Sequence, residues 1–298
     1  MLDKTNEIAS THLGKKSESI NIYSPSLLVA IPRAENRKQY NLEDYKLPFQ
    51  GYDIWHCYEF SCLTNNGFPI TRVLKIKYNC NSKFLVESKS LKLYLNSFNM
   101  SKFGKTIAET LETCKKIITK DLTEKLQTEI ELDFLEPKPP KYEIFNQFEN
   151  LLKFVDISNL KINSYKEAPE ILKYETTDKI KEYYLTFDSL RSNCRVTHQP
   201  DFGDVFIYYK SNKHVLEHSL IQYLTSFRTE NHFHEECCEM IFKRLNDLLE
   251  NSDELFVCAL YTRRGGIDIT PIRYKNCTIK DLASLTDTKI LARNGIKQ

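Results

Sequence analysis

A short internal repeat constrains the fold of this chain more than any other feature of its sequence. SLKLYLNSF at residues 90–98 and SLIQYLTSF at residues 219–227 agree at six of nine positions, with an offset of 129 residues. That offset is far longer than the period of a solenoid repeat, which is roughly 20–50 residues. The repeat therefore predicts two similar α+β units in tandem, each with helices covering one face of an antiparallel sheet.

Residue patterns predict the same order of elements in both units: two strands, helices and two more strands. Runs rich in aromatic and β-branched residues predict strands at 52–63, 71–78 and 129–136, and again at 182–190, 205–212 and 254–266. One predicted helix has Ser101 as its N-cap and an apolar face that runs from Phe103 to Ile118. Another is expected to begin at about Glu235.

These patterns divide the chain into three parts. We expect an N-terminal arm (1–45) that is loose over residues 1–40, a first domain (46–160) and a second domain (161–298). The segment EPKPPK (136–141) interrupts the pattern, because proline removes backbone donors and fixes φ.

Charge and cysteine content limit the classes of function. The formal charge of +2 gives no global basic field of the kind that drives non-specific nucleic-acid binding. The polar N-terminus and the absence of an apolar run of 18 residues predict a cytoplasmic protein with reduced thiols and no membrane segment. Six of the nine cysteines lie in apolar or strand-like contexts and are predicted to be buried structural thiols: Cys57, Cys62, Cys80, Cys114, Cys258 and Cys277.

The stretch RSNCRVTHQPDFGD (191–204) carries the first candidate for chemistry. Cys194 is followed by Arg195 and His198, and nearby cationic groups favour the thiolate that attacks an electrophile. Asp201, expected on a loop fixed by its Pro and Gly neighbours, could then act as a general acid. The same stretch is also typical of a structural cysteine at a strand end beside ordinary loop residues. Spacing alone therefore leaves both interpretations open.

The stretch FRTENHFHEECCEM (227–240) resembles a metal site at first sight. However, the adjacent Cys237 and Cys238 would point about 100° apart on a helix, and no CxxC or HExxH spacing supports zinc. We therefore expect no metal. The alternative is that His234 and Glu235 face a ligand from the start of a helix, where a carboxylate can accept two hydrogen bonds from a planar N–H edge.

Two further segments have the residue types that contact phosphate. VESKSLKLY (86–94) offers Glu87, Ser88 and Lys89, although an amphipathic segment with solvated lysines explains it as well. TRRGGIDITP (262–271) sets two arginines beside two glycines, which an ordinary hairpin turn also explains. The second repeat has Leu, Glu and His (216–218) where the first has Glu, Ser and Lys (87–89). Copies with such different polar residues predict one composite site built from both halves.

Taken together, these motifs resemble a known family. ESKSLKLYLNSF (87–98) is similar to the signature of the NADPH-dependent 7-cyano-7-deazaguanine reductases, the QueF nitrile reductases of queuosine biosynthesis, which is a tRNA modification. The resemblance extends to NCRVTHQPDFGD (193–204), FHEECCE (233–239) and YTRRGGIDITP (261–271), covers roughly residues 50–295, and leaves out the first 40 residues. It implies tandem duplicated tunnelling-fold (T-fold) domains, a homodimer, and no direct contact with nucleic acid or membrane.

The resemblance also implies a role for each motif residue. Cys194 would attack the nitrile to give a covalent thioimide, Asp201 would donate a proton, and His234 would assist. The residues implied to contact the substrate are Val86, Glu87, Ser88, His234 and Glu235. Those implied to contact NADPH, of which two molecules are consumed, are Ser88, Lys89, Arg263, Arg264 and Gly265. His198 is left without a chemical role, and we expect it to fix the loop.

Two other classes stay open at this point. One is a T-fold enzyme that hydrolyses a pterin or a purine with zinc, which metal analysis and NADPH consumption would distinguish from the reductase. The other is a binding module for RNA, against which the near-neutral charge argues.

Overall fold

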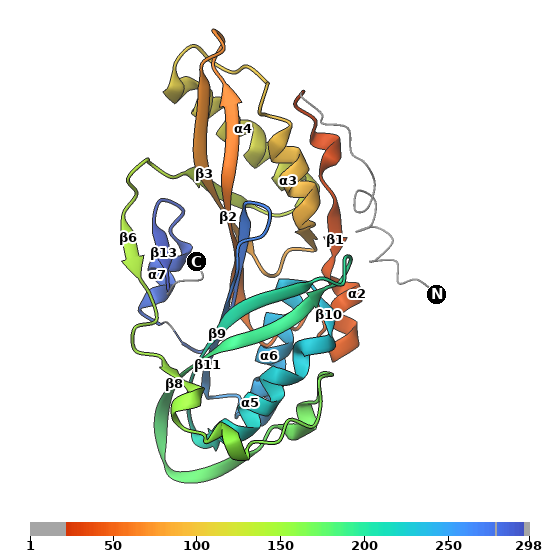
Figure 1. Ribbon diagram of the computed structural model, residues 1–298, viewed down its shortest axis with the longest axis vertical. Coiled ribbons are helices and arrows are strands. Elements are labelled where there is room, and N and C mark those ends of the chain that lie inside the picture. The colour runs from red at the N-terminus through yellow and green to blue at the C-terminus, as the bar shows by residue number, and fades with distance from the viewer. Residues whose placement is uncertain (1–21, 278, 295–298) are drawn as a thin grey trace.

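One twisted sheet runs through both halves of the chain. The computed structural model describes residues 22–277 and 279–294. Within these residues, nine strands form the sheet, with the path β10-β8-β9-β11-β12-β2-β3-β5 and with β7 paired to β8. The junction between the halves is the antiparallel pair β12–β2, whose register joins Ile267 to Cys57 and Tyr274 to Gln50. The result is an elongated molecule with the first half at one end and the second half at the other (Figure 1).

The strands of this sheet differ widely in length. Their bounds are β2 (Gln50–Leu63), β3 (Pro69–Asn79), β5 (Ile130–Phe134), β7 (Glu149–Asn150), β8 (Tyr174–Cys194), β9 (Pro200–Val215), β10 (Asn231–His232), β11 (Glu254–Tyr261) and β12 (Ile267–Lys275). Four further strands form two small two-stranded sheets: β1 (Ala30–Pro32) pairs with β4 (Phe84–Val86), and β6 (Lys141–Glu143) pairs with β13 (Leu291–Arg293).

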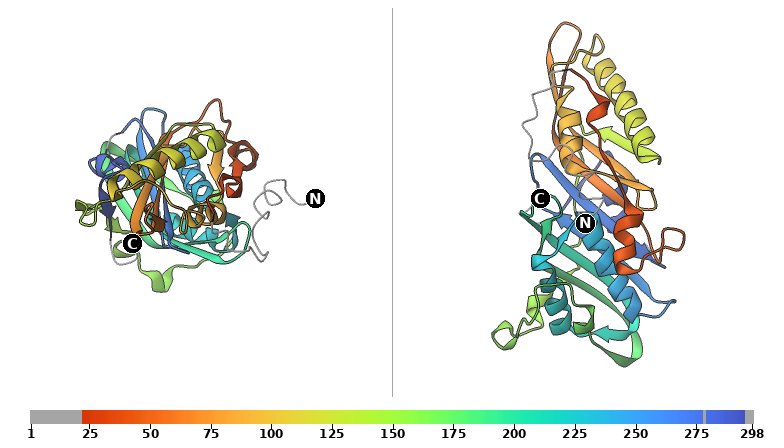
Figure 2. Two further views of the ribbon diagram at one scale, coloured as in Figure 1. Left: turned by 90° about the horizontal axis from the view of Figure 1, so that it is seen from above. Right: turned by 90° about the vertical axis from the view of Figure 1, so that its right-hand side faces the viewer.

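The longer helices lie against one face of the sheet, as predicted (Figure 2). They are α3 (Ser88–Asn96), α4 (Ile107–Leu126), α5 (Glu217–Thr225) and α6 (His234–Leu248). Alternate strand residues such as Trp55 pack on α3 and α4, and residues such as Val257 pack on α5 and α6. This alternation follows from the two-residue period of a strand, which sends successive side chains to opposite faces.

The other face of the sheet is also covered. Ile54, Phe206 and Ile272 point to this side and pack against Phe145 and Leu285 in a separate apolar cluster. The cover is made by α7 (Asp281–Thr286), by the β6–β13 pair and by the chain around β7 (Figure 1). The prediction that helices cover one face is therefore incomplete, since the short helix α7 lies on the second face.

The two repeated segments occupy equivalent places in the fold. Helices α3 and α5 begin at Ser88 and Glu217, which are separated by the same 129 residues as the sequence repeat. Each follows a pair of antiparallel strands, β2–β3 or β8–β9. The prediction of a fourth sheet strand in each half is wrong for the first half, because β6 leaves the sheet to pair with β13.

Two predictions about local structure in the first half are wrong. Helix α4 begins at Ile107 with Thr106 as its N-cap, whose Oγ1 accepts a hydrogen bond from the Glu109 N–H at 3.1 Å. Ser101 instead donates to the Ser97 carbonyl oxygen at 3.1 Å. The second wrong prediction is the loose arm: residues 1–21 lie outside the described part, but Leu28, Ile31 and Tyr40 are each at most 2% exposed.

The segment after residue 22 brings charges into the core. It contains β1, the helix α2 (Arg33–Arg37) and the 3₁₀ turns Pro25–Leu27 and Lys38–Tyr40. Elsewhere in the described chain, 3₁₀ turns occur at Leu151–Lys153, Ile157–Asn159, Pro169–Ile171 and Ser226–Thr229. Arg33 and Arg37 are 2% and 1% exposed. Arg33 pairs with Asp53 of β2, and Arg37 donates to Glu239 of α6 at 2.6 and 2.9 Å.

Arg273 of β12 completes this buried network. Its guanidinium contacts Asp53 at 2.9 Å and Glu239 at 2.8 Å, and none of these side chains is more than 3% exposed. Burying charges costs several kcal/mol per ion unless each charge is paired and hydrogen-bonded. Since the partners come from the N-terminal segment and from both halves, the network fixes how these three parts meet.

Candidate active site

Cys194 and Asp201 lie on adjacent strands at the tip of the β8–β9 hairpin. Ser192 is directly opposite Asp201 in the register, and Cys194 is the last residue of β8. Directly opposed residues share a face, as do residues two apart, so Ser192, Cys194 and Asp201 all project to the same side. Asp201 is thus placed by a strand, not by the loop that we predicted.

The loop between these strands is closed by His198. Its backbone N–H donates to the Cys194 carbonyl oxygen at 2.9 Å, and its φ of 56° lies in the left-handed region. The side-chain Nδ1 lies 2.8 Å from Asn231 Oδ1. These contacts agree with the loop-fixing role that we expected for this histidine.

A second histidine, His232, stands beside the thiol. It is paired with Cys194 in the parallel register of β10 and β8. Its ring nitrogens lie 3.2 Å from Glu230 and 3.2 Å from Glu236, and Arg195 also binds Glu236, at 3.0 Å. Burial tends to lower the pKa of His232, but the two glutamates outweigh it and raise the pKa to about 9. His232 is therefore an imidazolium at neutral pH, and its charge is balanced by the two glutamates.

This charge state predicts a pH-dependent contribution to stability. Because the pKa rises from an ordinary value near 6.5, the imidazolium stabilises the fold fully below pH 6.5 and progressively less as pH rises through 9. We expect His232→Gln to lower the free energy of unfolding by at most about 3 kcal/mol near pH 6, with a smaller loss at pH 10. Urea unfolding from pH 6 to 10 measures this, with exposed His218→Gln as the control. Equal losses at both ends of the range would contradict the assignment.

His234 and Glu235 begin α6 next to the same hairpin. His234 Nε2 lies 3.4 Å from Asp201 Oδ2, and its ring stacks on Tyr261 with centroids 4.0 Å apart. Burial lowers the pKa of His234 to about 4, against the opposing charge of Glu235, so the imidazole is neutral at pH 7. A neutral imidazole can both donate and accept a hydrogen bond.

Glu235 is a buried carboxylate, and one of its oxygens accepts no hydrogen bond from the described residues. It is 2% exposed, and its Oε1 has no hydrogen-bond partner within the described residues. Burial raises the pKa of Glu235 to about 7, helped by the charge of Asp53 and opposed by that of Arg33. A buried unpaired acceptor costs free energy in the free protein, which a ligand N–H would recover.

Glu87 reaches this region from the first half. As the N-cap of α3, its carboxylate accepts hydrogen bonds from the backbone N–H groups of Lys89 at 2.9 Å and Ser90 at 2.6 Å. Burial raises the pKa of Glu87 despite these hydrogen bonds. Each carboxylate oxygen has two lone pairs, so the capping role leaves acceptor capacity for a ligand.

A small apolar cluster connects Glu87 to the hairpin. Leu85 of β4 and Ile31 of β1 pack with Val196 from the hairpin loop and Phe233 from the start of α6. In Figure 1 the tip of β8–β9 and β10 lie beside β1. Val86 is 2% exposed in β4, directly before Glu87. Leu85, two residues before Glu87, thus packs against segments that adjoin Cys194 and His234.

The residues implied to contact NADPH separate into two sets. Ser88 and Lys89 are exposed at the start of α3, and the glycines of the β11–β12 turn lie over the same helix. A Cβ added at Gly265, whose φ is 56°, would lie 3.2 Å from Lys92 Nζ. Arg264 is on this side and binds Asp201, and its Nη2 donates to Gln199 at 3.1 Å.

Arg263 belongs to the second set. Its guanidinium carbon lies 3.3 Å from the centroid of the Tyr58 ring. Tyr58 donates its hydroxyl proton to Asp268, which belongs to the sheet face that α3 and α4 do not cover. Arg263 and Arg264 therefore lie on opposite faces of the sheet, although they are adjacent in the sequence.

The remaining cysteines agree closely with expectation. Five of the six predicted structural thiols are buried, and Cys277 is half-buried. Cys237 and Cys238 are fully buried in α6, and burial raises the pKa of Cys237 to about 12. Cys194 is partly exposed, unlike these two. Within residues 22–277 and 279–294, no three His, Cys, Asp or Glu side chains are grouped as a metal site would need.

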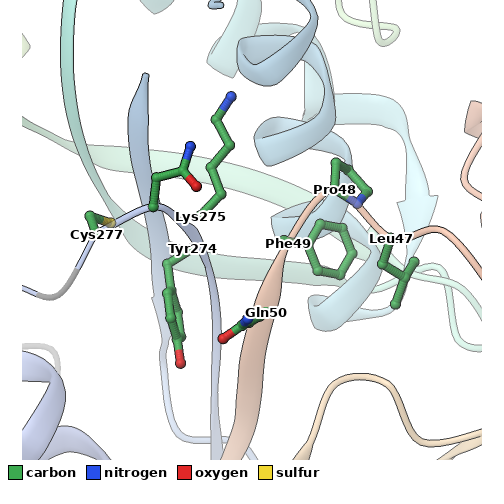
Figure 3. A pocket seen from close by; sticks show the side chains of 8 residues that line it. Leu47, Pro48, Phe49, Gln50, Tyr274, Lys275 and Cys277 are labelled. Atoms are coloured by element: carbon green, nitrogen blue, oxygen red, sulfur yellow. The ribbon is translucent and has the colours of Figure 1, made fainter. Parts of the chain in front are cut away.

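A cavity elsewhere contains none of the predicted site residues. It has a volume of about 600 Å³ and lies where Gln50 of β2 faces Tyr274 of β12, with Leu47 and Lys275 nearby (Figure 3). A search for membrane spans gave a negative result, since no helix in the described part of the chain is both long and apolar enough to cross a bilayer.

The sequence reasoning missed three contributors to the site. His232 was considered only as part of the stretch 227–240 that resembles a metal site, and Glu236 and Arg33 were given no role. The contact between Glu236 and His232 does not follow from helical spacing, because His232 lies in β10 and α6 begins only at His234. No local signal marks Arg33, because its partner Asp53 is reached only through the tertiary fold.

Comparisons with known proteins found matches to both halves of the chain. A family model described as nitrile reductase, 7-cyano-7-deazaguanine-reductase N-term, matches residues 20–134, and a model described as QueF-like protein matches residues 200–280. The similarity therefore starts well before residue 50, where we had expected it to begin. It includes the N-terminal segment that supplies Arg33 and Arg37 to the core.

Curated proteins named NADPH-dependent 7-cyano-7-deazaguanine reductase are similar over most of this chain. The protein from Colwellia psychrerythraea is 36% identical over 90% of this chain and 92% of its own length. That from Buchnera aphidicola is 40% identical over 86% and 94%, and that from Legionella pneumophila strain Paris is 38% identical over 88% and 89%. The chain belongs to the family of NADPH-dependent 7-cyano-7-deazaguanine reductases.

Proposed function

We propose that this protein reduces the nitrile of 7-cyano-7-deazaguanine to the primary amine, with Cys194 as the nucleophile. The observation that carries the proposal is that Cys194 and Asp201 lie on adjacent strands at one hairpin tip, with His234 of α6 3.4 Å from Asp201. Nitrile carbons are electrophilic but accept hydride slowly, and a covalent intermediate divides the reaction into easier steps.

The first step is attack by the Cys194 thiolate on the nitrile carbon. A carbon–sulfur bond forms, one carbon–nitrogen π bond breaks, and the nitrogen takes a proton to give a thioimide. Cys194 is suited to this role because it is partly exposed at the end of β8, whereas Cys237 and Cys238 are fully buried. Asp201 is the proposed proton donor, since it projects to the same side of the hairpin as the thiol.

Two molecules of NADPH, bound in turn, would supply the two hydrides that the reduction needs. The C–S bond to Cys194 would break as the imine forms, and the imine nitrogen would take one more proton to become the amine. The residues proposed to hold NADPH are Ser88, Lys89, Arg264 and Gly265. They fit such a group because α3 presents exposed Ser88 and Lys89, and the glycine turn lies against the same helix. Arg264 would have to exchange Asp201 for a phosphate oxygen, which would leave the Asp201 carboxyl free to carry a proton.

The base would be recognised by the buried carboxylates. Glu235, with its unpaired oxygen, suits the N–H edge of a guanine-like ring, and neutral His234 can hydrogen-bond a second ring atom. Glu87 retains acceptor capacity beyond its capping role. The chemistry needs a site closed to water, because an imine hydrolyses, and the apolar cluster of Ile31, Leu85 and Phe233 supplies one wall.

The pH dependence of substrate binding tests the role of Glu235. Only the ionised carboxylate accepts two N–H bonds, and its pKa of about 7 places the change near neutrality. We expect the affinity for the nitrile to be constant above about pH 8 and to fall by up to about tenfold per pH unit below 7. Calorimetry with Cys194→Ala protein would measure binding alone, without covalent reaction.

Glu235→Gln should bind about 10–100-fold more weakly at pH 8 and lose the pH dependence, because the amide cannot ionise. Exposed Glu124→Gln on α4 is the matched control and should keep the wild-type profile. A pH profile that persists in Glu235→Gln would mean that another group titrates.

Incubation with 7-cyano-7-deazaguanine tests the function as a whole. Without NADPH, we expect the protein mass to increase by the mass of the nitrile. With NADPH, two molecules should be oxidised for each nitrile consumed. A protein that oxidises no NADPH with this substrate would not have the proposed activity.

The proposal also covers the domain organisation, the oligomeric state and the pathway. We propose that residues 46–160 and 161–298 are tandem T-fold units, supported by the equivalent positions of α3 and α5. We also propose a homodimer and a place in the cytoplasmic synthesis of queuosine, which follow from the resemblance to the family. Sedimentation of the purified protein would test the dimer directly.

A further inference from the structure

A positively charged cavity lies on the sheet face opposite α3 and α4. It has a volume of about 480 Å³ and is lined by Tyr58 of β2, Arg72 of β3, Arg263 of the β11–β12 turn, Arg293 of β13 and Lys141 of β6. We call it the Tyr58 pocket. Leucine and proline residues of the segment 135–139 form its apolar rim, and a cavity of this size accommodates a small organic molecule.

The charges that line the Tyr58 pocket are strongly unbalanced. Four side chains are cationic, and the carboxylate of Glu136 is the only anion in the lining. Among the described residues, none of the four cations lies within ion-pairing distance of a carboxylate. Like charges repel, so gathering four of them costs free energy that a bound anion would recover.

One of these cations, Arg293, is held by a chain of hydrogen bonds that leads to buried Asp268. Arg293 donates to the Tyr58 hydroxyl at 2.6 Å, and Tyr58 donates to Asp268 at 2.6 Å. Asp268 also lies 2.7 Å from His56 Nδ1, and both residues are buried. Even when Asp268 is counted, four cations face two carboxylates, so an excess of positive charge remains at the pocket.

Tyr58 also orders the two guanidinium groups. The guanidinium carbons of Arg263 and Arg293 lie 3.3 and 5.2 Å from the centroid of its ring. Stacking on an aromatic ring fixes the plane of a guanidinium while its N–H edges stay available. Two oriented guanidinium groups beside a third arginine and a lysine match the several oxygens of a phosphate.

From this arrangement we infer that the Tyr58 pocket binds a phosphate group of a nucleotide. The site is separate from Ser88, Lys89, Arg264 and Gly265, which were proposed for NADPH in the reaction, because α3 lies on the other face of the sheet. The phosphate could belong to the adenosine end of NADPH or to a different nucleotide. Both sources present the same doubly charged phosphate to the arginines. The inference does not depend on nitrile chemistry, since binding is measured without turnover.

Calorimetric titration of the full-length protein with pyrophosphate, ADP and 2′,5′-ADP tests this inference. The test variant is Arg72→Gln/Lys141→Gln, because neither side chain is buried or ion-paired. We expect it to bind the probes at least about tenfold more weakly than the wild type. The control Lys120→Gln/Lys125→Gln removes two charges from the outer surface of α4 and should bind within about twofold of the wild type.

Three outcomes would overturn the inference. They are unchanged affinity in Arg72→Gln/Lys141→Gln, a loss of binding caused only by Lys89→Gln, and no binding of any probe at millimolar concentration. Unchanged thermal unfolding of the variants would establish that they are folded. A wild-type affinity that falls with added salt supplies a second measurement independent of any variant.

The probes also distinguish the source of the phosphate, and both results support the site. Tighter binding of 2′,5′-ADP than of ADP, with displacement by NADPH, assigns the pocket to the 2′-phosphate of the co-substrate. Equal binding of ADP with no displacement by NADPH assigns it to a separate nucleotide. Because no reduction is measured, failure of this inference leaves the proposed reductase activity untouched.

Discussion

Replacing Cys194 by alanine is expected to abolish reduction of the nitrile, with a loss on the order of 10⁴-fold or more in kcat/KM. The alanine side chain cannot form the carbon–sulfur bond on which both later steps depend. Since Cys194 is partly exposed at the end of β8 and outside the main cores, its removal should leave stability almost unchanged.

Two measurements on the same samples would check this result. NADPH absorbance reports turnover, and intact-protein mass reports the covalent adduct, which should be absent from Cys194→Ala. Cys277→Ala is the matched control, since it is the other partly exposed thiol among the described residues. Product formation by Cys194→Ala would show that the attack is made by another group, or that no covalent step is needed.

Replacing Asp201 by asparagine is expected to reduce turnover by about 10²–10⁴-fold. The amide keeps the shape of the side chain but has no acidic proton to give to the nitrile nitrogen. Mass analysis over time should show that the thioimide forms more slowly, while substrate affinity measured in the Cys194→Ala background changes little. Asp247→Asn, an exposed carboxylate on α6, is the control for the lost charge.

The pairing of Asp201 with Arg264 requires a second variant. Arg264→Gln removes the ion pair and leaves the acid, so it should weaken NADPH binding while adduct formation stays fast. If Asp201→Asn and Arg264→Gln slow adduct formation equally, Asp201 would act by holding the arginine instead of by donating a proton.

The buried charge network shows why some of the architecture was not predictable. The network joins four charged residues from separate segments: Arg33, Asp53, Glu239 and Arg273. Charged residues are usually at the surface, so nothing in these segments indicates burial. Their burial becomes tolerable only when each meets a partner of opposite charge. No local periodicity encodes such long-range pairing, so residues 22–40 were mistaken for part of a loose arm.

The helix start at Thr106 was missed for a different reason. Ser101 and Thr106 are both favourable N-caps, and the intervening Gly104 has a φ of 66°, which suits a turn and not a helix. An N-cap depends on the geometry of a few backbone groups, whereas the apolar face of α4 repeats over five turns. The periodic signal from Cys114 to Ile118 was therefore reliable, and the boundary was not.

Patterns in the sequence were enough to predict the class of fold, the 129-residue offset between α3 and α5, and the family that the motifs resemble. These properties are local or repeated, so short-range patterns are enough to carry them. Only the tertiary structure decided which side chains meet: His232 beside Cys194, Arg264 on Asp201, and Arg263 on Tyr58 on the opposite face. Contacts of this kind join residues far apart in the chain, and their charges and pKa values depend on burial that arises only when the sheet and helices pack together.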